Sequence, residues 1–293
     1  MFYGIYEIFG FFVLYSFFGW CFESTVVSVS QKKFINRGFL NGPVCPIYAV
    51  GALSIIFALY PIKDNILLLY ILGALLATVI EYIIGWGMEV IFKTKWWDYS
   101  SHKYQLHGRI CLTSSITWGF LAIVAMYFIH PQVEKILNTI PQDIGKFIEI
   151  FILAYFIIDL SITVMSVINL NAKLEMLSKV KAEIYEQLLA VKELDISVEL
   201  KARVNVFMEK IERKIPEIKS LEIIEEFGQL IGELKEVSGE KYKRFNQLLT
   251  SYREKLSVKN IIQKRLIKAY PNIKSSRFNE YLTELKEKVK NRK

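Results

Sequence analysis

Cysteine and histidine are scarce in this chain of 293 residues, which holds three of each. Cys21, Cys45 and Cys111 show neither a Cys-x-x-Cys spacing nor an even count, and this argues against a disulfide framework or a zinc ribbon. His102 and His107 do not have the spacing of a ligand signature either. We therefore expect buried free thiols and no metal site.

The chain also lacks the motifs of common enzymes. It contains no Ser/His/Asp order, no Gly-rich phosphate loop and no His-Glu-x-x-His sequence, so we expect no catalytic residue and no cofactor. Without a Walker motif, any ATPase must be a separate subunit. The N-terminus has neither a basic region nor a small-residue cleavage site, and we expect its first apolar run to be a retained anchor rather than a signal peptide.

Charge is rare in the first half of the chain. Residues 1–170 carry ten basic and ten acidic side chains, so the rest of the 37 basic and 29 acidic residues, and the whole net charge of +8, lie in residues 171–293. An apolar, aromatic half followed by a charged, periodic half predicts a transmembrane domain at 1–170 and a cytoplasmic helical domain at 171–293.

Five apolar segments in the first half approach the length of about 20 residues that a membrane-crossing helix needs. They are residues 8–30, 44–61, 66–92, 110–130 and 147–170. Because backbone polar groups find no water in lipid, such segments must be helical. The sequence predicts an all-α polytopic membrane protein with five transmembrane helices.

The connecting loops predict the orientation. The connections at 31–43 and 93–109 are rich in Lys and Arg, with Asp98 as their one acid, whereas those at 62–65 and 131–146 are balanced in charge. The positive-inside bias places the basic loops in the cytoplasm. We therefore expect a protein of the cytoplasmic membrane with its N-terminus outside and its C-terminus inside, as five spans also require.

An internal repeat relates residues 9–53 to residues 75–119 at an offset of 66 positions. Six identities carry it: Gly19 and Gly85, Trp20 and Trp86, Glu23 and Glu89, Leu40 and Leu106, Gly42 and Gly108, Cys45 and Cys111. Each copy is a helix ending in Gly-Trp-x-x-Glu, a basic loop and a second helix. Two spans per copy predict parallel repeats related by an axis along the membrane normal, with the fifth span outside them.

Acidic side chains within the apolar segments indicate a polar site. Glu23 and Glu89 lie near the cytoplasmic ends of their spans, and Glu81 and Asp159 lie deeper. A charge at the centre of a bilayer costs about 2.5–3.5 kcal/mol on insertion scales, so such acids are usually paired or hydrated. The alternatives are salt bridges that anchor a loop, or protonated carboxyls with hydrogen-bond partners.

We expect these acids and the loops to form a substrate path or polar site. Its candidate residues are Glu23, Glu81, Glu89, Asp159, Arg37, Asn36, Asp98 and Arg109. The candidates for helix packing are Gly19, Trp20, Gly85 and Trp86, because a small residue one turn from an acid lets another helix approach. In the first loop, Gly38, Gly42 and Pro43 allow a sharp return or a partly re-entrant path.

The second half predicts helices, because apolar residues recur at three- and four-residue steps from residue 171 onward. Further stripes at 197–214, 217–236 and 240–256 favour a short helical bundle or coiled-coil hairpin. Residues 251–293 carry 13 basic and four acidic side chains, which suits anionic lipid or an acidic protein partner. Nucleic acid is not favoured, because no recognition motif occurs.

Several motifs of the first half resemble a known family. The stretches GWCFE, NRGFLNGPVCPIYAVG, EYIIGWGMEVIF, WWDYS and GRICL are similar to the bacterial family described as putative ABC-transporter type IV, a CmpB-like group of membrane proteins. The resemblance covers about residues 10–170, and KRLIKAYPNIKS at 264–275 is similar to the tail of the same group. It implies a permease-like role.

Three hypotheses for the function follow. The first is a permease-type subunit of a transporter, in the lipid bilayer, with a separate ATPase partner or as a homo-oligomer. The second is an intramembrane enzyme acting on a lipid or lipid-linked substrate, with Glu23 or Glu89 as acid or base and Arg37 or Arg109 holding a phosphate. The third is a membrane-anchored scaffold whose tail recruits partners.

Overall fold

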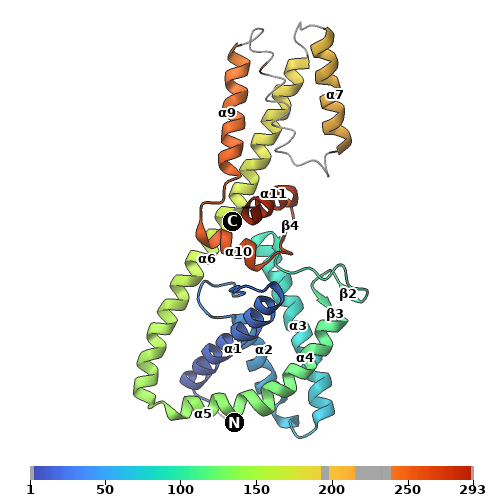
Figure 1. Cartoon of the computed structure of the whole chain (residues 1–293). Helices are drawn as coiled ribbons and strands as arrows, with labels where there is room; N and C mark the ends of the chain where they lie inside the picture. The colour runs from blue at the N-terminus through green and yellow to red at the C-terminus, as the bar shows by residue number, and fades with distance from the viewer. Residues whose placement is uncertain (1–2, 193–197, 215–231, 233–238, 292–293) are drawn as a thin grey trace. The chain divides into compact units, whose positions relative to one another are not determined.

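The computed structural model describes residues 3–192, 198–214, 232 and 239–291. The chain forms two compact units. Figure 1 colours the chain by residue number, from blue at the N-terminus to red at the C-terminus. The first unit consists of Met1–Ile168 together with Arg265–Ser276, and the second consists of Asn169–Lys264 together with Arg277–Lys293. A short segment from near the C-terminus therefore belongs to the fold of the N-terminal unit.

The first unit is built from apolar helices. They are α1 (Ile5–Gln31), α2 (Pro46–Leu59), the 3-10 turn η1 (Tyr60–Ile62), α3 (Ile66–Phe92), α4 (Leu112–Val124), the π turn η2 (Ala125–Ile129), α5 (His130–Thr139) and the first part of α6 (Gln142–Lys192). Helix α1 packs on α2, and α3 packs on α4 (Figure 1). Each predicted repeat thus corresponds to one pair of packed helices.

Four described helices are long and apolar enough to cross a membrane, by length and composition. They are Ile5–Gln31, Ile66–Phe92, Leu112–Thr139 and Gln142–Gln187. The segment predicted as a span at 44–61 instead forms the shorter apolar helix Pro46–Ile62. At 1.5 Å per α-helical and about 2 Å per 3-10 residue it covers roughly 27 Å, somewhat less than the hydrocarbon thickness of about 30 Å.

The first loop explains why α2 is short, because it folds back along α1 before α2 begins. The N–H of Cys45 donates to the carbonyl oxygen of Ser16 at 2.8 Å. Ser16 lies about 22 Å along the helix axis from the end of α1 at Gln31. The glycine-rich path expected at 38–43 therefore carries the chain deep into the unit.

The second loop returns in the same manner. Ser114, in the first turn of α4, donates to Glu81, which lies about 16 Å from the end of α3. Cys45 and Cys111 are the N-cap residues of α2 and α4, and the C-cap residues of α1 and α3, Lys32 and Lys93, are both left-handed, with φ of 51° and 49°.

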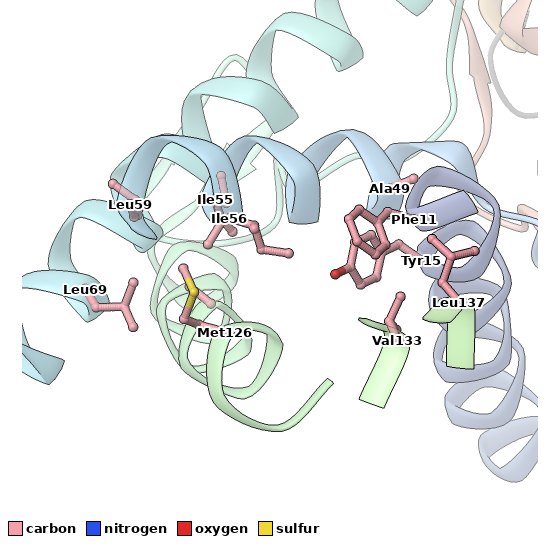
Figure 2. Close-up of a cluster of buried hydrophobic side chains, with 12 residues drawn as sticks. Phe11, Tyr15, Ala49, Ile55, Ile56, Leu59, Leu69, Met126, Val133 and Leu137 are labelled. Carbon is pink, nitrogen blue, oxygen red and sulfur yellow. The ribbon is translucent and has the colours of Figure 1, made fainter. Parts of the chain in front are cut away.

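The core of the first unit joins the two helix pairs to α5. It consists of Phe11, Tyr15, Ala49, Ile55, Ile56, Leu59, Leu69, Ala77, Ala122, Met126, Val133 and Leu137. Figure 2 shows Phe11 and Tyr15 of α1 beside Val133 and Leu137 of α5. Because lipid is as apolar as these side chains, close packing rather than escape from water holds this cluster together.

Two short antiparallel sheets complete the unit. Strand β2 (Gln105–Leu106) pairs with β3 (Ile110–Cys111) across a tight turn in which His107 and Gly108 have φ of 54° and 69°. Strand β1 (Thr94–Lys95) pairs with β4 (Lys274–Ser275) from the C-terminal segment.

The second unit is helical. It contains α6 beyond Ile168, α7 (Val198–Lys214), α9 (Gly239–Lys255), part of α10 (Ile261–Ala269) and α11 (Asn279–Asn291). The predicted apolar stripe of α6 is buried at Leu174, Leu177, Val180 and Ile184. The stripes at 197–214 and 240–256 form α7 and α9, and the stripe at 217–236 lies outside the described residues except for residue 232.

Candidate functional site

The two repeat-related acids each form an ion pair with an arginine of the adjacent loop. Glu23, near the end of α1, accepts from Nε of Arg37 at 3.3 Å and from the Tyr48 hydroxyl at 2.9 Å. Glu89, near the end of α3, accepts from Nη2 and Nε of Arg109 at 2.8 and 3.1 Å. Both arginines come from the set proposed from sequence.

Electrostatics strengthen the second pair. Burial lowers the pKa of Arg109, but the ion pair with Glu89 and the hydrogen bond to the Tyr82 hydroxyl at 3.1 Å outweigh it, and the net pKa is raised. Such pairing neutralises both acids and ties each loop to its own helix. These ion pairs therefore fit a structural role, in which each acid anchors a loop to its helix.

Glu81 has a different environment from the paired acids. Its side chain is buried, and it accepts hydrogen bonds from the Tyr99 hydroxyl at 3.1 Å, the Trp118 indole N–H at 2.9 Å and the Ser114 hydroxyl at 3.3 Å. None of these three donors is a Lys or Arg, so neutral groups of the second loop and α4 bind the carboxylate. A carboxylate has about four acceptor positions, and the donors in the described part of the chain leave one of them for a further donor.

A cavity of about 280 Å³ lies beside Glu81. Its wall is mostly apolar and comes from both helix pairs: Tyr15, Phe18, Gly19, Phe22, Ile47, Tyr48, Gly51, Ala52, Ile55, Ala77, Ile80, Glu81, Trp118, Leu121, Val124, Ala125 and Ile129. Phe18 and Phe22 are 37% and 46% exposed, which places one rim at the outer surface of the helices. The volume is close to the lower limit for small-molecule sites.

Asp159 binds the first loop rather than the cavity. One carboxylate oxygen accepts from the backbone N–H and the side-chain amide of Asn41, at 3.1 and 2.7 Å, and the other accepts from the N–H of Gly42 at 2.8 Å. These contacts supply partners for irregular backbone that would otherwise be unsatisfied at membrane depth. The deep acid of α6 thus serves the loop that folds back along α1.

Arg265 of the C-terminal segment binds the same loop. Its guanidinium donates to the carbonyl oxygens of Gly38 and Phe39 at 2.7 and 2.8 Å and to the side-chain oxygen of Asn41 at 3.1 Å. Burial lowers the pKa of Arg265, but arginine remains charged in proteins. We call residues 265–276, which join the first unit, the docking segment.

The docking segment also binds Arg37. The Tyr270 hydroxyl donates to the carbonyl oxygen of Arg37 at 2.6 Å, and the Arg37 guanidinium lies over the Tyr270 ring, 4.6 Å from its centroid. Arg37 further donates to the carbonyl oxygen of Ala269. The arginine that pairs with Glu23 is therefore fixed by the loop, α1 and the docking segment together.

Asp98 pairs with the docking segment at its far end. Its carboxylate lies 2.5 Å from Nζ of Lys274 and accepts from the N–H and hydroxyl of Ser100. Burial raises the pKa of Asp98, but these partners lower it by a larger amount, so that the net pKa falls to about 2. The ion pair stabilises the pairing of β1 with β4.

Acid is therefore expected to weaken this contact only at low pH. Because the folded pKa of Asp98 lies below its unfolded value of about 3.9, the stabilisation is complete above about pH 4 and is lost as pH falls toward about 2. The difference in melting temperature between wild type and Lys274→Ala should be constant above pH 4 and shrink below it. The matched control, Lys179→Ala in an exposed pair with Glu175, should show a smaller difference. A Lys274→Ala difference that does not change between pH 5 and 2.5 would contradict this assignment.

The remaining candidates have structural contacts. Asn36 accepts from the Trp20 indole N–H at 2.8 Å and donates to the Asn41 carbonyl at 2.8 Å, so it organises the first loop. A Cβ on Gly19 would lie 2.3 Å from Cβ of Tyr48, and one on Gly85 would lie 3.0 Å from the Trp97 ring. In contrast to Trp20, Trp86 is 52% exposed.

The three cysteines are free thiols, and they belong with His, Asp and Glu to the kinds of side chain that can bind a metal ion. Within the residues that the structure describes, no group of three His, Cys, Asp or Glu side chains could hold a metal ion. Cys45 and Cys111 are buried. Cys21 is only half-buried, contrary to the expectation of three buried thiols.

The sequence did not single out several residues of the site, among them Tyr15, Trp118 and Arg265, nor His130, which lies within hydrogen-bond distance of Tyr15. The polar His130 at the end of an apolar run was a usable signal, and Arg265 lies in the stretch that resembles the family's tail. Tyr15 and Trp118 look like ordinary members of aromatic helices. Only their partners, His130 and Glu81, distinguish them.

Long apolar helices with polar groups held between them define an integral membrane protein. The chain matches the family described as putative ABC-transporter type IV over residues 10–164, more than half of its length, and it belongs to that family. Membership assigns a transporter-like role at the level of the family. No curated protein and no solved structure matches the chain.

Proposed function

We propose that this protein is a permease-like subunit whose cavity receives an amphipathic molecule from the membrane. The observation that carries the proposal is the cavity of about 280 Å³ with Glu81 in its wall. The apolar lining suits a hydrocarbon body, and the open acceptor position of Glu81 suits one donor group, such as an ammonium or a hydroxyl. The rim formed by Phe18 and Phe22 gives entry from lipid.

The proposed topology has five spans, with α2 and η1 as a short crossing. In its support, the docking segment bonds to Gly38 in the first loop and pairs with β1 after α3. Both basic loops therefore lie at one end of the first unit, so the chain between them crosses and returns. The positive-inside bias makes that end cytoplasmic. The shared caps and packed pairs support the parallel repeat.

The proposal assigns different tasks to the acids. Glu81 belongs to the substrate path, whereas Glu23, Glu89 and Asp159, which do not line the cavity, hold the two loops. Arg37 and Arg109 already pair with acids, and this disfavours the lipid-enzyme alternative, in which they would bind a phosphate. A separate ATPase subunit and anionic lipid at the basic C-terminal end complete the proposal.

Filling the cavity tests this function. A side chain at Gly51, in the cavity wall, would enter open space, and so Gly51→Leu should exclude a ligand without a clash. We expect mass spectrometry of the full chain, extracted gently from its native membrane, to find a bound amphiphile in wild type and about tenfold less in Gly51→Leu, the loss produced by about 1.4 kcal/mol.

The matched control is Gly87→Leu. Gly87 is a helical glycine with equally open space around its Cβ position, but it does not line the cavity. This variant should retain the amphiphile at the wild-type level. Equal retention by both leucine variants, or wild type that carries no amphiphile, would refute the proposed function.

A further inference from the structure

A line of hydrogen bonds leads from the cavity to the end of the first unit at which α1 begins. Tyr15 is one of the residues that line the cavity, and its hydroxyl lies 2.6 Å from Nδ1 of His130. Nε2 of His130 lies 3.2 Å from the Tyr3 hydroxyl. The Tyr3 hydroxyl donates in turn to the carboxylate of Glu134 at 2.5 Å.

Hydrogen-bond accounting gives this line a direction. The one hydrogen of the Tyr3 hydroxyl is committed to Glu134, so the Tyr3 oxygen must accept from Nε2 of His130. A neutral imidazole has one donor and one acceptor, and Nδ1 is then the acceptor for Tyr15. Each donor thus points away from the cavity and toward Glu134.

The backbone around His130 is specialised. His130 is 3% exposed within a candidate membrane span and follows the π turn η2, so that its N–H bonds to the carbonyl oxygen of Ala125, five residues earlier. Single π turns inside helices occur frequently at functional sites. The Phe11 ring packs edge-on against the imidazole, with 5.4 Å between the ring centroids, so that an apolar side chain borders this line of hydrogen bonds.

We propose that Tyr15, His130, Tyr3 and Glu134 form a proton relay between the cavity and this end of the unit. A protonated group in the cavity gives a proton to the Tyr15 oxygen, and the Tyr15 hydroxyl hydrogen moves to Nδ1 of His130. The Nε2 hydrogen moves to Tyr3, and the Tyr3 hydroxyl hydrogen moves to Glu134. The cavity group loses one proton and Glu134 gains one, while the imidazole ends as the other neutral tautomer.

The ends of the relay fit this task. Glu134 is half-buried, so that it can exchange protons with water, and Tyr15 is buried at the cavity. Besides the members of the relay, the titratable groups that the described residues pack against the same core include Tyr6 of α1 and Tyr60 of η1. The relay rests on the proposed function, because it makes deprotonation of a bound amine or water part of the transport cycle. Membrane pumps and transporters commonly use chains of acids and histidine in this way.

Proton flux tests the relay. The full chain is reconstituted in vesicles of neutral and anionic phospholipid that contain a pH-sensitive dye, and a potassium gradient with valinomycin drives protons across. Wild type should exceed protein-free vesicles, and Tyr15→Phe and Glu134→Gln should each lower the flux by about tenfold. Tyr6→Phe, on the same helix, removes a buried hydroxyl that has no hydrogen-bond partner and should leave the flux unchanged.

Each other outcome is decisive. A wild-type flux equal to that of protein-free vesicles, or a Tyr15→Phe flux equal to wild type, overturns the relay. Melting temperatures of the variants check folding. If Tyr15→Phe is unfolded, Glu134→Gln, whose side chain is only half-buried, replaces it as the test variant. Wild-type proton flux without any bound amphiphile would refute the proposed function and leave the relay standing. Bound amphiphile with unchanged Tyr15→Phe flux would do the reverse.

Discussion

Asp159→Ala is expected to release the loop at 32–45 and to destabilise the first unit strongly. The substitution removes the acceptor for the N–H groups of Asn41 and Gly42 and for the Asn41 amide. Each stranded buried donor costs about 1–3 kcal/mol, so we expect a total of about 3–5 kcal/mol. Asp159→Asn keeps one acceptor oxygen and should lose less.

The measurement is thermal unfolding of the full chain in mild detergent, followed by limited trypsin digestion. Arg37, which the folded loop holds in place, should become a fast cleavage site in Asp159→Ala. Asp143→Ala, an exposed acid at the start of the same helix, is the matched control and should melt like wild type. An Asp159→Ala protein with wild-type stability and digestion would mean that the carboxylate does not hold the loop.

Gly19→Ala is expected to separate α1 from α2. The added methyl group would lie 2.3 Å from Cβ and 2.4 Å from Cγ of Tyr48, distances that force the helices or the ring to move. Overpacking of this kind costs about 1–3 kcal/mol. Since Tyr48 also donates to Glu23 at 2.9 Å and lines the cavity, its displacement should reduce both stability and ligand retention.

Gly51→Ala provides the comparison, because the same methyl group on α2 meets nothing within 4 Å. Replacing a helical glycine by alanine there should be neutral or stabilising by up to about 1 kcal/mol. The two variants thus share a helix-propensity gain and differ only in the clash. If Gly19→Ala melts at or above the temperature of Gly51→Ala, the close approach of α1 and α2 at Tyr48 is not a constraint.

Local patterns were sufficient to predict most of the helices. Long apolar runs gave α1 and α3, and the three- and four-residue steps gave the buried face of α6 at Leu174 and Leu177. The glycines at 38 and 42 predicted a returning loop, and the bond from Cys45 to Ser16 is its outcome. The length of the helix after that loop was predicted wrongly. The depth at which the loop ends depends on its hydrogen-bond partners, and local sequence does not report them.

Contacts between distant parts of the chain could not be predicted. Asp159 looked like an isolated deep acid, and its partner loop is 118 residues away in the sequence. Arg265 looked like one cation in a basic terminus, yet it bonds to carbonyl oxygens more than 220 residues away. Helical periodicity reports which face of a helix is buried and carries no information about which side chain it meets.

Membership of the docking segment in the first unit sets an order for biosynthesis. Asn41 leaves the ribosome 224 residues before its partner Arg265, which at 5–20 residues per second is a wait of roughly 10–45 s. During this interval the nascent chain already holds its apolar helices, but the carbonyl oxygens of Gly38 and Phe39 lack the donor that Arg265 supplies. We expect a chain truncated before Arg265 to leave this loop more open to proteases than a chain that includes Arg265.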